Sequence, residues 1–328
     1  MIELEEALEI VLSQVKVLSA ERVNLLSSLG RTLAEDVCAD FDIPGFDRAA
    51  MDGYAVISKD LDSASKKRPE VLEVIADLPA GGSTKERVRR GKAVKIMTGA
   101  PMPQGADAVV MAEDTEKDHR KVKVFRSVGP QENVSFAGED VKKGELILPQ
   151  SSLIRPAEVA MLASLGRRNV LVRTKPRVAI LSTGDELVEV GGTLERGEIY
   201  DSNSFALFSQ VLLSGGEPYR LGIARDKKED LLARIKEGLS YQILILSGGV
   251  SVGDYDLVID VLREAGVKML FWKVAVKPGK PTFFGIRKDT LVFGLPGYPV
   301  SSMVNFENLV RPAIFSMLGR RDWQRIRV

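Results

Sequence analysis

Three lysines placed between prolines are the residues of this sequence best suited to chemistry. Lys273, Lys277 and Lys280 lie in the segment FWKVAVKPGKPTFFG, residues 271–285. Because proline fixes φ and glycine lets the backbone turn closely, this loop should hold its ammonium groups in a nearly fixed cluster. A solvated surface turn is the alternative, and the hydrophobic runs on both sides favour the rigid loop. The segment therefore predicts a binding site for a small anion with several negative charges.

A glycine-rich segment, SGGVSVG at residues 247–253, predicts a second place where an anion could bind. It follows an apolar run and precedes a helical pattern, where exposed N–H groups and hydroxyls can hold phosphate. It matches neither the Walker loop nor the dinucleotide fingerprint, so a plain strand-to-helix connection is the alternative. The residues expected to contact the ligand there are Ser247, Gly248, Gly249, Ser251 and Gly253.

Carboxylates follow the glycine-rich segment directly. Asp254 and Asp256 would repel a bound phosphate unless a divalent cation lay between them, so they predict a Mg²⁺ site. Asp185, Glu186 and Asp226 could supply further oxygen ligands from neighbouring loops. Helix capping or a surface ion pair is the alternative for each acid, and for Asp226 the two interpretations are nearly balanced.

The segment PGFDRAAMDGYA, residues 44–55, combines aromatic, acidic and glycine residues in an unusual way. It could be a domain-entry loop in which Asp52 and Gly53 form a turn. Spacing alone does not make Asp52 catalytic.

The composition excludes several classes of function. The 328 residues carry 46 basic and 45 acidic side chains, so the formal net charge of +1 gives no overall attraction to nucleic acid or anionic membrane. One cysteine, Cys38, and one histidine, His119, exclude a disulfide framework, a Cys/His zinc site and a histidine-based triad. No apolar run reaches ~18 residues and the acidic start lacks a basic n-region, so we expect a cytoplasmic protein without a membrane segment.

The part of the chain before Pro176 predicts helices around an inserted β-rich unit. Apolar residues recur at helical spacing over residues 4–15, and a second helical pattern follows before Gly30. The runs AVKIMTGA, ADAVVMAED and KVKVFRSV, within residues 93–128, are short and β-rich. PAEVAMLASLG, residues 156–166, has Pro near its first turn and Gly just past its end, as a helix does.

Beyond Pro176 the pattern is α/β. RVAILSTGDEL, YQILILSGGVSV and TLVFGLPGYPV are apolar runs followed at once by polar or Gly-rich loops, with helical segments at about 203–214, 227–239 and 256–265 between and around them. Such alternation predicts a parallel sheet with right-handed crossovers. Because ligands bind beyond the carboxyl ends of parallel strands, the loops named above should meet at one edge.

Seven ordered segments resemble the MoeA family, which includes the E domain of gephyrin. They are PGFDRAAMDGYAV, KIMTGAPMPQGADAVVMAED, AILSTGDEL, GEIYDSNS, LSGGVSVGDYD, FWKVAVKPGKP and GLPGYPVS, and they span nearly the whole chain. The resemblance implies a multidomain α+β and α/β fold. Its expected parts are a discontinuous helical dimerisation domain (1–44 and 141–173), an inserted β-rich domain (45–140), a three-layer α/β molybdopterin-binding domain with a mainly parallel sheet (174–320), and the start of a C-terminal β domain (321–328).

The same resemblance implies an activity, that of a molybdopterin molybdenumtransferase. The implied reaction inserts molybdate into adenylylated molybdopterin with Mg²⁺-assisted release of AMP, in a homodimer supplied by a molybdopterin adenylyltransferase. The residues at positions matching the family's molybdate site are Lys277, Lys280, Pro281 and Ser301, with Lys273 nearby. The residues at positions required for activity are Asp52, Thr98, Glu186, Asp226 and Asp256.

Three departures from the family pattern affect these expectations. Ser135 stands where family members carry an arginine, and Tyr298 stands where they carry an asparagine. The chain also stops where a fourth domain should begin, as a shortened or naturally short form. A carrier of adenylylated pterin with weak insertion activity is therefore the alternative function, whereas an adenylyltransferase is disfavoured because it would not need residues 1–170.

Overall fold

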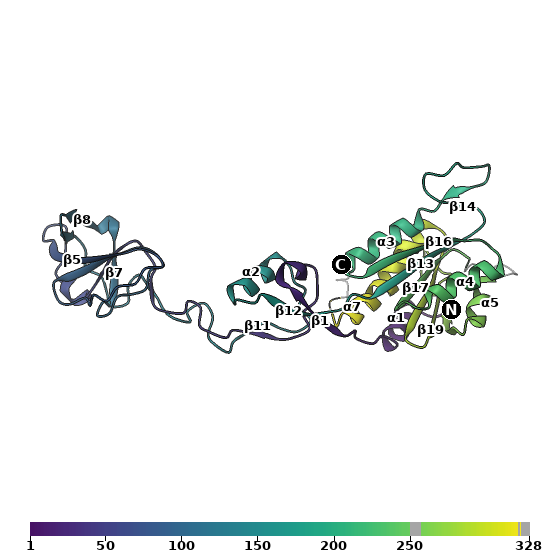
Figure 1. The fold of residues 1–328 in the computed structure, drawn as a ribbon, viewed down its shortest axis with the longest axis horizontal. Helices are drawn as coiled ribbons and strands as arrows, with labels where there is room; N and C mark the ends of the chain where they lie inside the picture. The colour runs from purple at the N-terminus through teal and green to yellow at the C-terminus, as the bar shows by residue number, and fades with distance from the viewer. Residues whose placement is uncertain (250–256, 321, 323–328) are drawn as a thin grey trace. The chain divides into compact units, whose positions relative to one another are not determined.

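The chain folds into two units, one of which is discontinuous in sequence (Figure 1). The first unit holds Met1–Asp36 and Leu148–Val328, and the second holds Val37–Ile147. This computed structural model describes residues 1–249, 257–320 and 322. The finer division into a helical, a β-rich and an α/β domain stays a prediction.

A six-stranded sheet forms the centre of the first unit, in the order β16-β13-β17-β20-β19-β18. Its strands are β13 (Arg177–Thr183), β16 (Glu217–Ala224), β17 (Ile243–Ser247), β18 (Lys268–Trp272), β19 (Phe283–Arg287) and β20 (Thr290–Leu295). The four strands from β16 to β20 are parallel, whereas β19 runs antiparallel to both of its neighbours. The predicted mainly parallel sheet is therefore confirmed.

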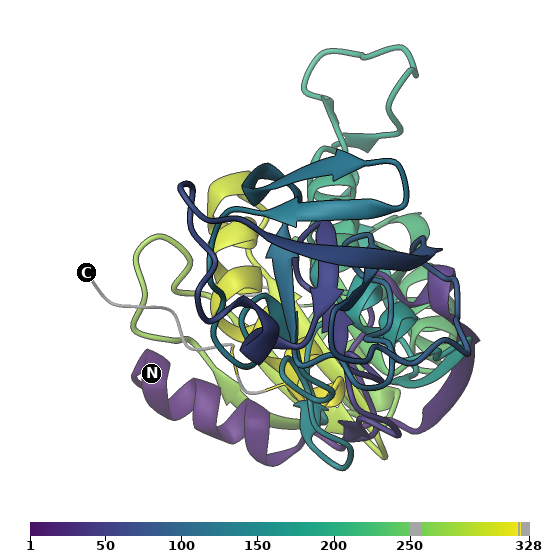
Figure 2. The ribbon, with the colours of Figure 1, turned by 90° about the vertical axis from the view of Figure 1, so that its left-hand side faces the viewer.

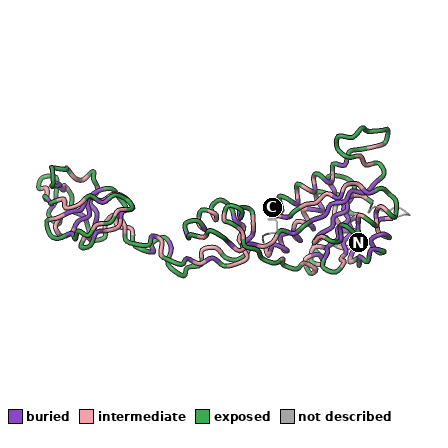
Figure 3. The backbone as a smooth tube through the Cα atoms, viewed as in Figure 1, coloured by how far each residue is buried: buried purple, intermediate pink, exposed green. Residues whose placement is uncertain are grey.

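Helices cover both faces of this sheet and make three layers (Figure 1). One face packs against α1 (Leu4–Ser13), α3 (Asn203–Leu213), the π-helical turn Phe306–Val310 and α7 (Arg311–Met317), and the other against α4 (Lys228–Gly238) and α5 (Leu257–Glu264). The helix α6 (Pro299–Asn305) runs directly into the π-helical turn. The inner strands β13, β17 and β20 are buried along almost all of their length because both of their faces are apolar (Figure 3). The edge strands β16 and β18 are only partly buried.

The rest of the first unit corrects one prediction. The expected second helix before Gly30 is wrong, because Ala20–Asn24 is a strand, β1, followed by a short 3-10 helix, Leu25–Ser28. β1 pairs antiparallel with β12 (Asn169–Arg173), so a partner far away in sequence overrides the local helical pattern. The helix α2 (Pro156–Ser164) forms where the sequence predicts it.

The second unit is built on a six-stranded sheet in the order β7-β4-β6-β5-β9-β8. Its strands are β4 (Gly53–Val56), β5 (Glu70–Leu78), β6 (Lys92–Ile96), β7 (Ala108–Met111), β8 (Thr115–Asp118) and β9 (Lys121–Val124). Alternate residues of β4, β6 and β7 enter two separate apolar cores, one on each face. Because both faces of these strands are largely buried, most of their residues are apolar.

Short strands complete both units. They are β2 (Val37–Cys38), β3 (Arg48–Ala49), β10 (Val134–Ser135), β11 (Leu146–Leu148), β14 (Leu187–Val188) and β15 (Ile199–Tyr200). The segment between β14 and β15 projects from the α/β part of its unit (Figures 1 and 2). No helix in the described part of the chain is long and apolar enough to span a membrane.

Candidate anion-binding site

The carboxyl ends of the parallel strands meet at one edge of the sheet, as predicted. Thr183 pairs with Ala224, and Ser247 pairs with Leu295, so β13, β16, β17 and β20 end side by side. Because β18 and β20 are both antiparallel to β19, β18 also ends at this edge, at Trp272. The lysine loop and the glycine-rich segment therefore leave the sheet on the same side.

Backbone hydrogen bonds close the lysine loop on itself. Lys273 N donates to Thr282 O over 3.0 Å, and Val274 N donates to Lys280 O over 3.0 Å. The side chains of Lys277 and Lys280 are exposed, and Lys273 Nζ lies 4.2 Å from the centre of the Trp272 ring. The loop thus exposes the ammonium groups of Lys277 and Lys280 and holds that of Lys273 against an aromatic ring.

Asn305, which sequence reasoning missed, anchors this loop to α6. It is 0% exposed, and its Nδ2 donates to Gly279 O and to Thr282 Oγ1 over 2.9 Å each. A Cβ on Gly279 would lie 2.2 Å from that nitrogen, so glycine is needed there. Ser301, 7% exposed, lies one helical turn earlier on the same face. The sequence gives no clear signal for this role, because Asn305 is one of several polar residues in its helical stretch.

The glycine-rich segment begins as a tightly packed turn. Ser247 is buried at the end of β17, and Gly248 and Gly249 have φ of +94° and +65°. A Cβ on Gly248 would lie 2.7 Å from Thr183 O, so only glycine fits. The predicted contact and metal residues further along, Ser251, Gly253, Asp254 and Asp256, lie outside the described residues.

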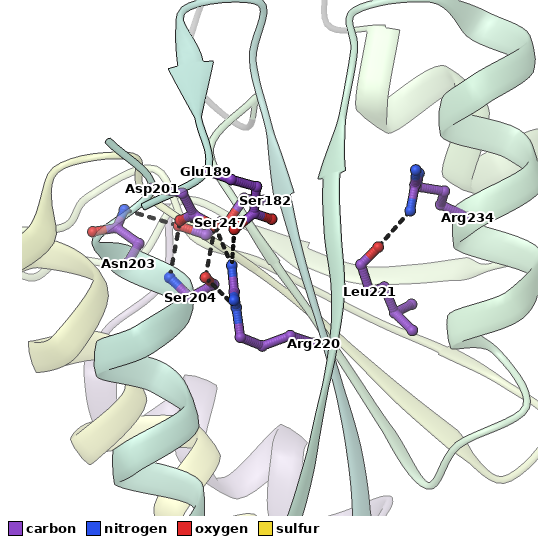
Figure 4. A network of polar contacts seen from close by, with 9 residues as sticks. All are labelled: Ser182, Glu189, Asp201, Asn203, Ser204, Arg220, Leu221, Arg234 and Ser247. Carbon is purple, nitrogen blue, oxygen red and sulfur yellow. Dashed lines mark hydrogen bonds and ion pairs between the residues drawn. The ribbon is translucent and has the colours of Figure 1, made fainter. Parts of the chain in front are cut away.

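A buried polar network holds the loops at this edge together (Figure 4). Asp201, 1% exposed, accepts hydrogen bonds from Ser182 Oγ at 2.9 Å and from Ser204 Oγ at 2.6 Å. Asn203, at the start of α3, donates through Nδ2 to Ser247 Oγ at 2.9 Å and to Gly297 O at 2.7 Å. Sequence reasoning predicted Ser247 as a ligand contact but gave Ser182, Asp201, Asn203 and Ser204 no role. Asn203 ties the loops after β17 and β20 to one helix end.

Three of the predicted acids gather at the ends of β13 and β16. Asp226 N donates to Asp185 Oδ1 over 3.1 Å. Desolvation, and then the charges of Asp185 and Glu186, raise the pKa of Asp226 above its usual value. Such crowding of carboxylates fits a cation, because a cation would relieve the repulsion. Yet no three acids, histidines or cysteines within the described ranges are placed to hold a metal ion together, so the Mg²⁺ site stays a prediction.

The second unit holds the other predicted pair, Asp52 and Thr98. Thr98 N and Thr98 Oγ1 both donate to Asp52 Oδ1 over 2.7 Å. These hydrogen bonds, the backbone one first, lower the pKa of Asp52 and keep it ionised. Next to them is a hollow of about 490 Å³ whose lining includes Arg48, Thr98, Ser135 and Asp140. The structure thus brings Asp52 and Thr98 together, beside a space that could admit a ligand.

Fold and site together define a class of protein: a multidomain α+β protein whose α/β part offers cationic and glycine-rich loops at the carboxyl edge of its sheet. Known families agree with this class. Residues 2–166 match the model "MoeA N-terminal region (domain I and II)", and residues 179–316 match "Probable molybdopterin binding domain".

Individual relatives cover almost all of the chain. Molybdopterin molybdenumtransferase of Bacillus subtilis is 39% identical over 322 residues, 97% of this chain and 75% of that protein. The enzyme of the same name from Haemophilus influenzae is 39% identical over 93% of this chain and 74% of its own length. The crystal structure of the molybdopterin biosynthesis MoeA protein from Pyrococcus horikoshii has a TM-score of 0.86 at 37% identity, over 98% of this chain and 81% of that one.

The chain therefore belongs to the MoeA family, the molybdopterin molybdenumtransferases, as the sequence predicted. This is a family of transferases in molybdenum cofactor biosynthesis.

Proposed function

We propose that this chain inserts molybdate into adenylylated molybdopterin, with Mg²⁺-dependent release of AMP. The names of its relatives support the transfer of molybdenum to a pterin. The observation that carries the proposal is the lysine loop. Lys277 and Lys280 are exposed on a loop that Asn305 fixes to α6, at the edge where the glycine-rich segment also begins. Such a rigid pair of cations suits a compact dianion such as molybdate.

The residues of the site would act mainly by binding and orientation. Lys277 and Lys280 would hold the oxyanion through charge-assisted hydrogen bonds, with Pro281 and Ser301 beside them. Ser247 and Gly248 would hold the phosphate of the pterin substrate. Ordering two reactants at fixed positions lowers the barrier without a covalent enzyme intermediate.

The carboxylates would serve departure of AMP. Asp185 and Asp226, which lie in contact, would bind Mg²⁺ together with the phosphate of the substrate, with Glu186 nearby. The cation would supply positive charge to the leaving phosphate. Thr98 keeps Asp52 ionised, and the carboxylate of Asp52 would accept a hydrogen bond from the substrate. We also propose a homodimer, supplied by an enzyme that adenylylates molybdopterin.

An insertion assay tests the proposal. Purified chain, adenylylated molybdopterin and Mg²⁺ are combined with molybdate or tungstate, and AMP release and metal bound to pterin are measured. We expect both to depend on the oxyanion and on Mg²⁺. Tight pterin binding without any AMP release would contradict the transfer and favour the carrier function. Absence of pterin binding would contradict both.

A further inference from the structure

The hollow in the second unit contains one cation that no function has yet been given. Its lining residues are Arg48, Ala49, Ala50, Thr98, Gly99, Val134, Ser135, Glu139 and Asp140. Within residues 37–147, all of which the structure describes, Arg48 is the one basic residue of this lining. Its side chain is 39% exposed, so it can meet both the hollow and solvent.

The Arg48 guanidinium has spare hydrogen-bonding capacity. Its nearest carboxylate oxygen is Asp140 Oδ2, 3.7 Å from Nη2, which is too long for a hydrogen bond. Among the described residues the guanidinium makes no hydrogen bond at all, although it carries five N–H donors. Asp140 is 61% exposed, so this loose ion pair contributes little.

The other carboxylate that lines the hollow, Glu139, already has hydrogen-bond partners. Glu139 Oε2 accepts hydrogen bonds from Ser135 Oγ at 2.6 Å and from Phe136 N at 3.1 Å, which close the turn after β10. Glu139 is therefore partnered within its own turn, and it leaves the donors of Arg48 available to a ligand.

We propose that Arg48 forms an oxyanion subsite in this hollow, which takes a phosphate group of the pterin substrate. A guanidinium binds phosphate through two parallel N–H···O bonds, and the ligand would replace Asp140 as its partner. The adjacent Thr98 hydroxyl and Asp52 then face the same substrate. This inference rests on the proposed function, because that function supplies the phosphate-bearing ligand.

The strand pairing provides a direct test. Ser135 lies directly opposite Arg48 in the antiparallel pair of β3 and β10, so side chains at the two positions share one face. A guanidinium moved from position 48 to position 135 should therefore reach the same hollow. Arg48→Ala should weaken binding of adenylylated molybdopterin roughly ten- to a hundredfold. Arg48→Ala combined with Ser135→Arg should recover most of that loss.

Arg90→Ala is the matched control, because Arg90 also lies 3.7 Å from a carboxylate, that of Asp60, but does not line the hollow. It should bind like the parent. Unchanged affinity in Arg48→Ala, or no recovery in a double variant that melts like the parent, would overturn the inference alone. A parent chain that binds no adenylylated molybdopterin would instead overturn the proposed function, and the subsite with it.

Discussion

Lys277 and Lys280 differ from ordinary surface lysines in the backbone that carries them. Both are exposed, yet the loop between Lys273 and Thr282 is closed by its own hydrogen bonds and anchored by Asn305. Little backbone entropy is then lost when an anion binds, so these two lysines contribute more to the binding free energy than lysines on a mobile loop would.

The first prediction concerns these two residues. Lys277→Ala or Lys280→Ala should each weaken molybdate binding by about 1.5–3 kcal/mol, because each removes a direct charge-assisted contact. Calorimetric titration with molybdate measures the effect, and Lys236→Ala, at an exposed position of α4, is the control. Parent-like affinity in both loop variants would contradict the anion site.

Asp226 carries the second prediction. Its raised pKa reflects desolvation and the charges of Asp185 and Glu186, a repulsion that bound Mg²⁺ would relieve. Asp226→Asn should therefore largely abolish Mg²⁺-dependent AMP release and spare pterin binding. AMP release is followed against Mg²⁺ concentration, with Asp260→Asn on α5 as the control. If Asp226→Asn matches the parent at limiting Mg²⁺, the acids serve only the fold.

At the scale of elements, α6 connects two parts of the anion site. Asn305 bonds the lysine loop, and Ser301 lies on the same face of the helix. The π-helical turn begins at the next residue, Phe306, and turns of this kind are frequent at functional sites.

Asn305→Ala should loosen the lysine loop without a large change of fold. Gly279 O and Thr282 Oγ1 would lose their donor, so we expect lower molybdate affinity and a loss of about 1–3 kcal/mol in stability. Ser302→Ala is the control, because Ser302 Oγ is buried in the same helix and has no partner among the described residues. Calorimetry and thermal melting separate the two effects. Parent affinity in Asn305→Ala would show that the loop is rigid without its anchor.

The helix α2 gives a prediction about pH. Glu158 accepts hydrogen bonds from the side chain and the backbone N–H of Arg155, which lower its pKa from 4.5 to about 2. A lowered pKa stabilises the fold above about pH 4.5, and the contribution is lost as the pH falls toward 2. Glu158→Gln should cost about 0.5–2 kcal/mol at pH 7, and the cost should shrink below pH 4.5.

Melting temperatures of the parent and Glu158→Gln between pH 7 and pH 3 measure this difference. Glu237→Gln, at an exposed position near the end of α4, is the control. A difference that stays constant over this range would mean that Glu158 stabilises α2 without its charge.

Local patterns predicted most elements, and long-range pairing explains the rest. α3, α4 and α2 have strong periodicity or clear end signals, so the sequence predicted them. β1 did not follow its local pattern, because its partner β12 lies far along the chain. The same holds for the site: prolines and glycine mark the lysine loop locally, whereas Asn305 gains its role only when the fold brings α6 to Gly279.

At the scale of the whole molecule, the predicted functional residues are divided between the two units. Asp52 and Thr98 belong to the second unit, whereas Lys277 and Asp226 belong to the first. By resemblance to the family, we propose that each active site takes residues from both subunits of a two-fold dimer, and that each dimer has two equivalent sites.

Mixing two inactive variants tests this arrangement. Asp52→Ala and Lys277→Ala homodimers should each lose activity, since each damages both sites. Refolding them together should give about half heterodimers with one intact site each, and so recover roughly a quarter of the parent activity. No recovery in verified heterodimers would place each site within one subunit.

The strand order of the α/β sheet also sets the distance between the two parts of the predicted site. The acids follow β13 and β16, whereas the lysine loop follows β18, four strand spacings from β13. At roughly 4.8 Å per spacing, these strand ends lie about 19 Å apart. A single ligand that meets both must be extended, or the loops must bend toward each other across the glycine-rich segment. A compact tetrahedral oxyanion covers only one end of this distance, whereas a pterin joined to a nucleotide has the length to cover much more of it.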